Sequence, residues 1–129
     1  MVTKTIIATA NAPQAIGPYS QAVQVGNWLY LSGQIPLVPA TGELVTGTFE
    51  AQVVQIFQNI AAILAAAGAD FSHVVKTTVF LKNLDDFAEM NRIYAQYFPT
   101  NPPARSTIQV AKLPKDVPIE IEMIACFGA

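Results

Sequence analysis

One long amphipathic helix, predicted over Glu50–Ala67, constrains the fold of this chain more than any other segment. Apolar residues recur through it at helical spacing, whereas Gln52, Gln55 and Asn59 fall mostly on the opposite side. Gly68 follows directly and is suited to end it. A helix with one apolar stripe must be covered by another layer, so the rest of the chain has to supply that layer.

A second, shorter helix is predicted to begin at Asp85 or Asp86 and to be closed by Pro99. Asp86 and Glu89 have the spacing of a capping box. The inner stripe of this helix is predicted to consist of Phe87, Met90, Tyr94 and Tyr97. Two helices leave most of the chain for strands and loops.

The other periodic segments are short, which is typical of strands. They are Thr3–Ala8, Gln21–Val25, Trp28–Ser32, His73–Lys82, Arg105–Ala111 and Ile119–Phe127. A Gly26-Asn27 turn joins the second to the third, and the prolines and glycines of 35–48 indicate a long loop. The order β-β-β-α-β-α-β-β predicts one α+β domain over residues 1–129, with two helices packed on one face of a largely antiparallel or mixed sheet.

The composition indicates that other subunits cover part of the surface. Hydrophobic residues make up 52% and charged residues 12% of the chain, whereas roughly a quarter of an ordinary soluble domain is charged. Polar residues interrupt every apolar run before the roughly 18 residues that cross a bilayer, and the N-terminus lacks the pattern of a signal peptide. We therefore expect no membrane partner, and a homo-oligomer whose interfaces bury the surplus apolar surface.

Charge and cysteine content argue against several classes of function. A net charge of −2 with scattered basic residues argues against a nucleic-acid partner. Cys126 is the only cysteine, so no internal disulfide can form, and the sequence has no Cys/His cluster for a metal. These features are typical of a cytoplasmic protein, in which we expect Cys126 to be a small buried hydrophobe and His73 a structural or surface residue.

Arg105, one of only two arginines, is the strongest candidate for ligand binding. It opens a predicted strand behind Pro102-Pro103, and the alternation places Arg105, Thr107 and Gln109 on one face. A guanidinium at the mouth of a strand, beside a hydroxyl and an amide, can hold a carboxylate or a phosphate in a bidentate fork. The alternative is a surface arginine paired with a nearby acid.

Other residues lie where a ligand could reach them, although each also has an ordinary structural explanation. Tyr19 follows a rigid Gly-Pro turn, Gly33 ends a strand where backbone can approach a ligand, and Asn91 lies in an aromatic-rich helical turn. On the last strand Glu120 and Glu122 share a face. Acids within an apolar strand should be paired, exposed or functional.

Five segments, taken together, are similar in order and spacing to those of one known family. They are Ala15-Ile16-Gly17-Pro18-Tyr19-Ser20-Gln21-Ala22, Leu31-Ser32-Gly33-Gln34-Ile35-Pro36, Val75-Lys76-Thr77-Thr78-Val79-Phe80-Leu81, Pro103-Ala104-Arg105-Ser106 and Ile119-Glu120-Ile121-Glu122. They resemble the Rid family of YjgF-type reactive intermediate deaminases, and the arginine segment marks its RidA subgroup. The resemblance implies a chorismate-mutase-like α+β fold assembled as a homotrimer, with active sites in the clefts between subunits.

The resemblance also implies a reaction. RidA-type members hydrolyse 2-imino acids and their enamine tautomers, such as 2-aminoacrylate, which pyridoxal-phosphate-dependent dehydratases release; the products are 2-keto acids and ammonia. They need no cofactor or metal. By position, Arg105 is expected to hold the substrate carboxylate, Glu120 to act on the attacking water and Tyr19 to line the cleft. The substrate-binding residues implied beside Arg105 are Ser32, Gly33, Asn91 and Thr107.

One residue departs from the family pattern, because many relatives carry a cysteine where this chain has Thr107. Thr107 keeps a small polar side chain on the Arg105 face, so we expect a changed substrate preference or redox sensitivity and not loss of the reaction. Two other functions stay open. One is a non-catalytic module that binds a small carboxylate to regulate a partner; the other is an endoribonuclease or translation inhibitor, against which the acidic balance argues.

Overall fold

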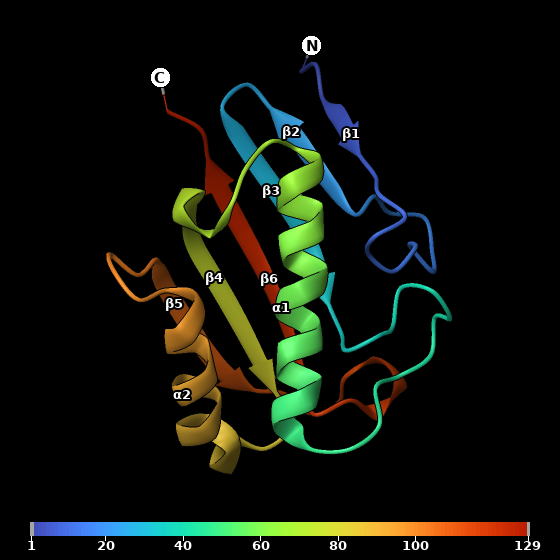
Figure 1. Ribbon diagram of the computed structural model, residues 1–129, viewed down its shortest axis with the longest axis vertical. Coiled ribbons are helices and arrows are strands. Elements are labelled where there is room, and N and C mark those ends of the chain that lie inside the picture. The colour runs from blue at the N-terminus through green and yellow to red at the C-terminus, as the bar shows by residue number, and fades with distance from the viewer. Residues whose placement is uncertain (1, 129) are drawn as a thin grey trace.

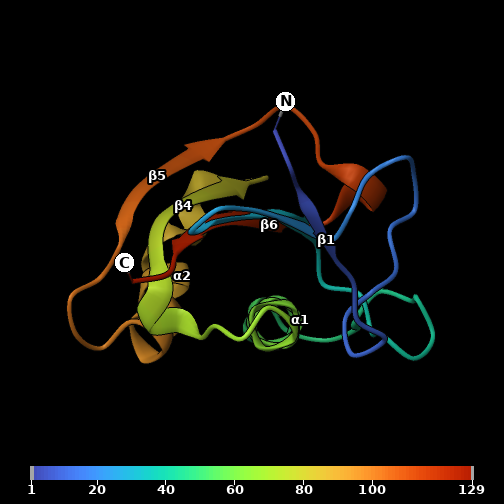
Figure 2. The ribbon, with the colours of Figure 1, turned by 90° about the horizontal axis from the view of Figure 1, so that it is seen from above.

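The computed structural model describes residues 2–128, which form one mixed β-sheet with two helices on the same face (Figures 1 and 2). The strands are β1 (Thr5–Ile7), β2 (Ala22–Val25), β3 (Trp28–Gln34), β4 (Val74–Leu81), β5 (Ala104–Gln109) and β6 (Ile119–Cys126). The helices are α1 (Phe49–Ala66) and α2 (Phe87–Tyr97), with the short 3₁₀ helices η1 (Phe71–His73), η2 (Leu84–Asp86) and η3 (Pro114–Asp116). The predicted α+β class and the order of the main elements are confirmed.

The strand order β1-β2-β3-β6-β4-β5 puts the last strand of the chain inside the sheet. Neighbouring strands are antiparallel except β4 and β5, which are parallel. Parallel neighbours need a crossover connection, and α2 supplies it. Because α2 ends shortly before β5, the strand that opens with Ala104 and Arg105 starts near the C-terminal end of that helix (Figure 1).

α1 begins and ends within one residue of its predicted bounds. The Thr48 hydroxyl accepts a hydrogen bond from the Ala51 N–H at 3.1 Å and caps the first turn. Gly68 follows with a φ of +79°, a left-handed conformation that suits glycine. By length and composition alone the helix could cross a membrane, but its apolar side is packed in the core. The buried apolar residues are Val53, Ile56, Phe57, Ile60, Ile63 and Leu64.

Asn59, predicted on the polar side of α1, is buried. Its Nδ2 donates to the Leu37 carbonyl oxygen at 2.8 Å, and its Oδ1 accepts from Gln55 Nε2 at 2.9 Å. The helical pattern fails here because the loop that carries Leu37 packs against this side of the helix. A buried amide is tolerated when both of its ends are hydrogen-bonded.

The predicted capping box of α2 is wrong. η2 precedes the helix, and the Asn83 side chain caps that turn by accepting from the Asp85 N–H at 2.9 Å. Asp86 therefore lies in a helical turn that has already begun, and its side chain makes no capping bond. The predicted inner stripe is partly wrong as well, since Phe87 is 39% exposed. The buried residues of α2 are Met90, Ile93 and Tyr94.

The first part of β4 departs from the predicted alternation. Alternation along His73–Lys82 predicts that Val75 shares one face with His73, Thr77, Val79 and Leu81. A register shift between Val74 and Lys76 instead buries Val74 and leaves Val75 42% exposed. Beyond the shift the predicted face is observed, with Thr77, Val79 and Leu81 buried. Such an irregularity re-aims the side chains of a strand by one position.

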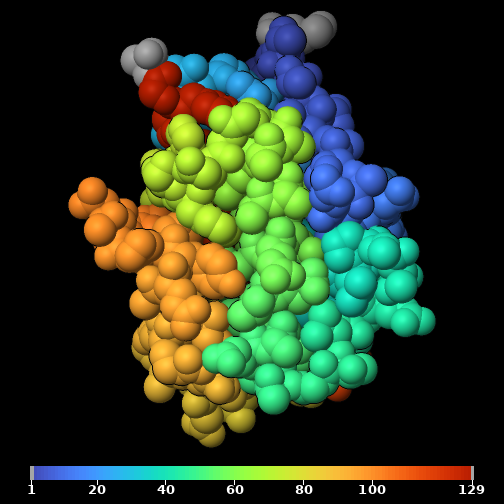
Figure 3. Space-filling view, viewed as in Figure 1, coloured from blue at the N-terminus to red at the C-terminus, as the bar shows by residue number. Residues whose placement is uncertain are grey.

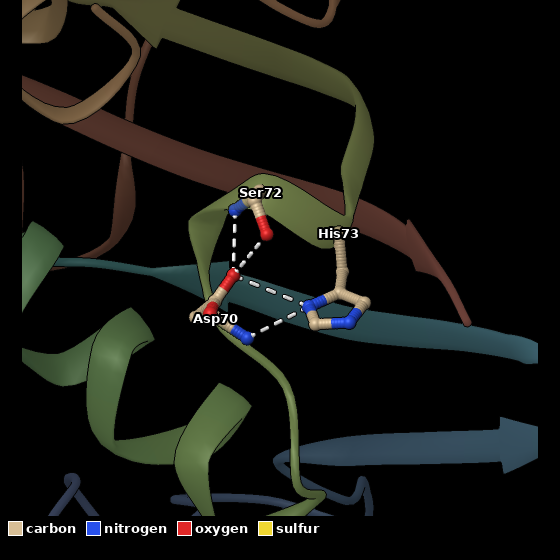
Figure 4. A network of polar contacts seen from close by, with 3 residues as sticks. All are labelled: Asp70, Ser72 and His73. Atoms are coloured by element: carbon tan, nitrogen blue, oxygen red, sulfur yellow. Dashed lines mark hydrogen bonds and ion pairs between the residues drawn. The ribbon is translucent and has the colours of Figure 1, made fainter. Parts of the chain in front are cut away.

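His73 lies in η1 and not in the strand, and it closes a small polar network (Figure 4). The Asp70 N–H donates to His73 Nδ1 at 3.1 Å, and Asp70 Oδ1 accepts from the Ser72 N–H at 2.8 Å. The ring centroid of His73 is 5.5 Å from that of Phe127. This capping box and aromatic contact give His73 a structural role.

The two faces of the sheet differ in character. The face covered by α1 and α2, which Figure 3 shows from the helix side, holds the main core. The strand registers place four exposed apolar side chains on the other, open face: Ile6, Trp28, Tyr30 and Ile108. A smaller core, into which Phe80 of β4 packs, consists of Ile35, Leu37, Leu113 and Val117.

Candidate active site

Arg105 lies at the start of β5, on the face of the sheet that the helices cover. It is in register with the buried Thr77 of β4, and its Cζ lies 4.8 Å from the ring centroid of Tyr94 and 5.5 Å from that of Phe87. Within residues 2–128 no carboxylate forms an ion pair with its guanidinium. The alternative of a surface arginine paired with an acid is therefore not found among the described residues, and the N–H donors are left for a ligand.

A pocket opens beside Arg105. It is lined by Asn91, Tyr94, Ala95, Phe98, Pro102, Pro103 and Arg105. Two buried oxygens, Asn91 Oδ1 and Thr107 Oγ1, have no hydrogen-bond partner among the described residues. Buried polar atoms are rarely left unpaired in a folded protein. Both oxygens are therefore candidates to bind a ligand or a partner subunit.

Glu120 lies on β6, on the open face of the sheet. Its side chain passes over Gly33 of β3, where an added Cβ would lie 2.9 Å from the Glu120 Cδ. Burial raises the pKa of the Glu120 carboxyl, and the negative charge of Glu122 raises it further. A carboxylate with a raised pKa is a better proton acceptor than one in water. The cavity beside it is lined by Tyr19, Gly33 and Glu120 together with Gln21, Ile35 and Pro114.

Local hydrogen bonds hold Tyr19 and Ser32 in place. The Tyr19 hydroxyl accepts from the Ile16 N–H at 3.2 Å. The Ser32 hydroxyl donates to the Ser20 carbonyl oxygen at 2.6 Å. Ser32 thus ties the segment after Tyr19 to β3, and its side chain supports the cavity without being one of its lining groups.

Gln21 also lines this cavity, a role that its sequence pattern does not predict. Its Nε2 donates to the carbonyl oxygens of Thr9, Ala12 and Pro13 at 3.1, 3.3 and 2.8 Å, and its Oε1 accepts from the Thr9 N–H at 2.7 Å. Its amide satisfies the backbone of the loop before β2 and so fixes the wall beside Tyr19. An amide at the start of an otherwise apolar strand is the only sequence signal for this role.

Arg105 and Glu120 lie on opposite faces of the sheet. Arg105 is in register with Thr77, and Glu120 is in register with Phe80, three residues further along β4. Side chains an odd number of residues apart on a strand point to opposite sides. The predicted site residues therefore form two groups. We call Arg105, Asn91 and Thr107 the arginine half-site, and Tyr19, Gly33 and Glu120 the glutamate half-site.

The chemistry of these half-sites is that of one cation and one buried acid. Arg105 can bind an anion, and Glu120 can accept and return a proton. Among residues 2–128 no three His, Cys, Asp or Glu side chains lie together as a metal site would need. Cys126 is half-buried, less than predicted, with Sγ 3.4 Å from the Phe127 carbonyl oxygen.

Comparison with known proteins shows the family of this chain. The family model described as Endoribonuclease L-PSP matches residues 9–127. The chain is 54% identical over 122 residues to a RutC family protein of Pyrococcus horikoshii, covering 95% of this chain and 97% of that protein. It is 52% identical over 125 residues to the human 2-iminobutanoate/2-iminopropanoate deaminase, covering 97% and 91%. The chain belongs to the Endoribonuclease L-PSP family, which is the YjgF or Rid family that its motifs resemble.

Solved structures of relatives share the fold. RidA from an Antarctic Psychrobacter is 47% identical with a TM-score of 0.92, covering 95% of this chain and 99% of that one. E. coli TdcF with bound serine is 45% identical with a TM-score of 0.91, covering 96% and 99%. The family model is described as an endoribonuclease, whereas the names of relatives include RutC family protein and deaminase. Membership therefore establishes the fold and the family, and the activity has to be argued from the site.

Proposed function

We propose that this protein is a 2-iminobutanoate/2-iminopropanoate deaminase, which hydrolyses 2-imino acids and enamines such as 2-aminoacrylate to 2-keto acids and ammonia. The observation that carries the proposal is Arg105, a guanidinium without an acid partner among residues 2–128, held beside a pocket against two aromatic rings. Such a group fits the carboxylate that every 2-imino acid carries. The human and bovine relatives that are 52% and 50% identical are named for this activity, and TdcF binds serine, another small carboxylate.

The proposed active site lies between subunits of a homotrimer, where the arginine half-site of one subunit meets the glutamate half-site of the next. Two observations support this arrangement. The half-sites occupy opposite faces of one sheet, so a single chain cannot close them around one small substrate. The open face also exposes large apolar side chains, which favours its burial against another subunit.

The proposed reaction uses Glu120 as a proton carrier. Arg105 binds the carboxylate and presents the C=N carbon to a water molecule that Glu120 and the Tyr19 hydroxyl orient. The water oxygen bonds to this carbon while Glu120 takes one water proton and passes it to the nitrogen, which gives a carbinolamine. Glu120 then moves the hydroxyl proton in the same way as the C–N bond breaks. The oxygen becomes the keto oxygen, and the nitrogen leaves as ammonia.

So small a set of groups is sufficient because imines already hydrolyse in water. The protein has to supply orientation and general-base help, and the latter contributes roughly 10²–10⁴-fold. Neither requires a strong nucleophile. No metal or cofactor takes part in the proposed mechanism.

A coupled assay tests the proposal. A serine or threonine dehydratase generates the imino acid in place, and the appearance of keto acid is followed with and without the protein. We expect acceleration by wild type and a loss of roughly a hundredfold in Arg105→Ala, because a bidentate charged contact is removed. Arg92→Ala is the matched control, since the other arginine is exposed and pairs with Glu50 at 2.6 Å. It should keep the wild-type rate.

The same assay separates the other candidate functions. No acceleration by a folded wild-type oligomer would rule out the deaminase for these substrates. Binding of a small carboxylate that depends on Arg105, without turnover, would then identify a regulatory module. RNA cleavage by the purified protein would instead favour the activity in the family's name, which the net charge of −2 disfavours.

A further inference from the structure

The guanidinium of Arg105 packs against Tyr94, a residue outside the five sequence segments that resemble the family. Tyr94 of α2 is 6% exposed, and Thr77 of β4 is fully buried. Their hydroxyl oxygens lie 2.8 Å apart, and the Tyr94 ring centroid lies 4.8 Å from the Arg105 Cζ. A continuous series of contacts therefore runs from the sheet, through the Tyr94 ring, to the cation.

We propose that Tyr94, fixed by its hydrogen bond with Thr77, is a positioning residue that holds Arg105 in the orientation that binds a carboxylate. This inference rests on the proposed function, because it assigns the support of the proposed carboxylate-binding group. It adds Tyr94, which belongs to neither half-site, to the residues on which that function depends.

An aromatic ring is better suited to this task than an acid. A carboxylate beside Arg105 would occupy its N–H donors and compete with the substrate carboxylate. A ring attracts the cation through its π face and leaves the donors at the edge of the guanidinium free. An arginine side chain carries roughly 2 kcal/mol of rotamer entropy. Holding it before the substrate arrives reduces the entropy lost on binding.

Thr77 determines the orientation of the Tyr94 ring. A buried phenol needs a hydrogen-bond partner, and Thr77 provides it. Thr77 is also in register with Arg105 on the neighbouring strand, so one stretch of sheet sets both the anchor of the ring and the start of the arginine side chain. Burial raises the pKa of Tyr94, although the Thr77 hydrogen bond and the Arg105 charge act the other way. The phenol stays neutral and does not neutralise the cation.

A purely structural role for Tyr94 makes a different prediction. Its ring also packs 4.8 Å from that of Phe98 and 6.0 Å from that of Phe57, between centroids. A residue that only fills the core would change stability on substitution and leave the motion of Arg105 unchanged. Tyr97 is the matched control, because it stacks on Phe57 at 4.1 Å while the rings near Arg105 are those of Phe87 and Tyr94.

Arginine side-chain NMR tests the inference directly, because the chain has only Arg92 and Arg105 and hence two Nε–Hε signals. We expect the Arg105 order parameter to fall from about 0.85 in wild type, the value of a rigid backbone, to below about 0.6 in Tyr94→Leu. Tyr94→Phe, which keeps the ring and loses the hydroxyl, should fold and give an intermediate value. Tyr97→Leu should leave Arg105 rigid. The Arg92 signal should not change in any of these variants.

Affinity for pyruvate, a stable 2-keto acid, gives a second measurement. We expect Tyr94→Leu to raise its Kd about tenfold and Tyr97→Leu to leave it unchanged. An Arg105 signal as rigid in Tyr94→Leu and Tyr94→Phe as in wild type would overturn the inference, whatever the enzyme assay shows. A different result is that Arg105 loses order in these variants while the wild-type protein hydrolyses no imine. That result would support the positioning role and rule out the proposed function. The two failures are therefore distinguishable.

Discussion

At the scale of single residues, Glu120 shows a conflict between stability and chemistry. Burial, and then the charge of Glu122, raise the pKa of its carboxyl above the ordinary value. Between the ordinary and the raised pKa the folded chain holds more protons at this site than the unfolded chain, so its contribution to stability falls as the pH rises through that window. The charged form that the fold disfavours is the form that accepts a proton from water.

Removing the neighbouring charge should therefore shift the pH dependence of the reaction. Activity is expected to fall as the pH drops through the pKa of Glu120, because the protonated acid cannot act as a base. Glu122→Gln removes one cause of the raised pKa, so the acid limb of the kcat/KM profile should move to lower pH. Glu43→Gln, at an exposed loop carboxylate, is the control and should leave the limb in place. If the acid limb of the kcat/KM profile stayed in place in Glu122→Gln, the limb would report the titration of a group other than Glu120.

At the scale of elements, the irregular end of β3 makes room for the Glu120 side chain. The pairing of β3 with β6 shifts register between Leu31 and Gln34, and Gly33 lies within the shift. Its φ is not in the left-handed region, so the backbone does not require glycine. The lack of space requires glycine, because the Glu120 side chain occupies the position that a Cβ of residue 33 would take. Bulges of this kind are frequent beside active sites.

Gly33→Ala should therefore damage the reaction more than the fold. The added methyl group would lie 2.9 Å from the Glu120 Cδ and push the carboxylate aside. A displacement of about 1 Å can cost about a hundredfold in rate, which we expect here in kcat/KM. Gly128→Ala, where the methyl group meets no other atom within 4 Å, is the matched control. Thermal unfolding of both variants should stay close to wild type; full activity in a folded Gly33→Ala would exclude this role for the glycine.

The elements that sequence reasoning predicted correctly are those whose cause is local. α1 has its cap, its apolar stripe and its terminal glycine within one stretch of chain, and it was predicted to within one residue at each end. The errors have non-local causes. Asn59 is buried because the distant Leu37 binds it, and Val75 is exposed because pairing with β6 shifts register. The Tyr94–Thr77 bond joins a helix to a strand, and periodicity within either element cannot show it.

At the scale of the whole molecule, the candidate residues could be predicted from sequence, but not their division into two half-sites. The motifs and the alternation of the last two strands pointed to Arg105 and Glu120 separately. Arg105 and Glu120 face opposite sides of the sheet because of how β5 and β6 pair with β4, which lies between them. Strand order is set by long-range pairing, which local patterns do not contain. The separation and the apolar open face together support the proposal that two subunits complete each active site.

Mixing two inactive variants tests whether the half-sites come from different subunits. In oligomers refolded together from Arg105→Ala and Glu120→Gln chains, a site between subunits is intact only when an unchanged Arg105 meets an unchanged Glu120. Random assembly makes this true of about one site in four, so we expect about a quarter of the wild-type activity. Each variant refolded alone should be nearly inactive.

The control mixture combines Glu120→Gln with Gly33→Ala, which change the same half-site. Every glutamate half-site in that mixture is damaged, so co-assembly should restore nothing. If Arg105 and Glu120 instead acted within one chain, the first mixture would be as inactive as the control, because every chain would lack one of the two residues. Recovery in the first mixture alone therefore requires that each active site is shared between neighbouring subunits.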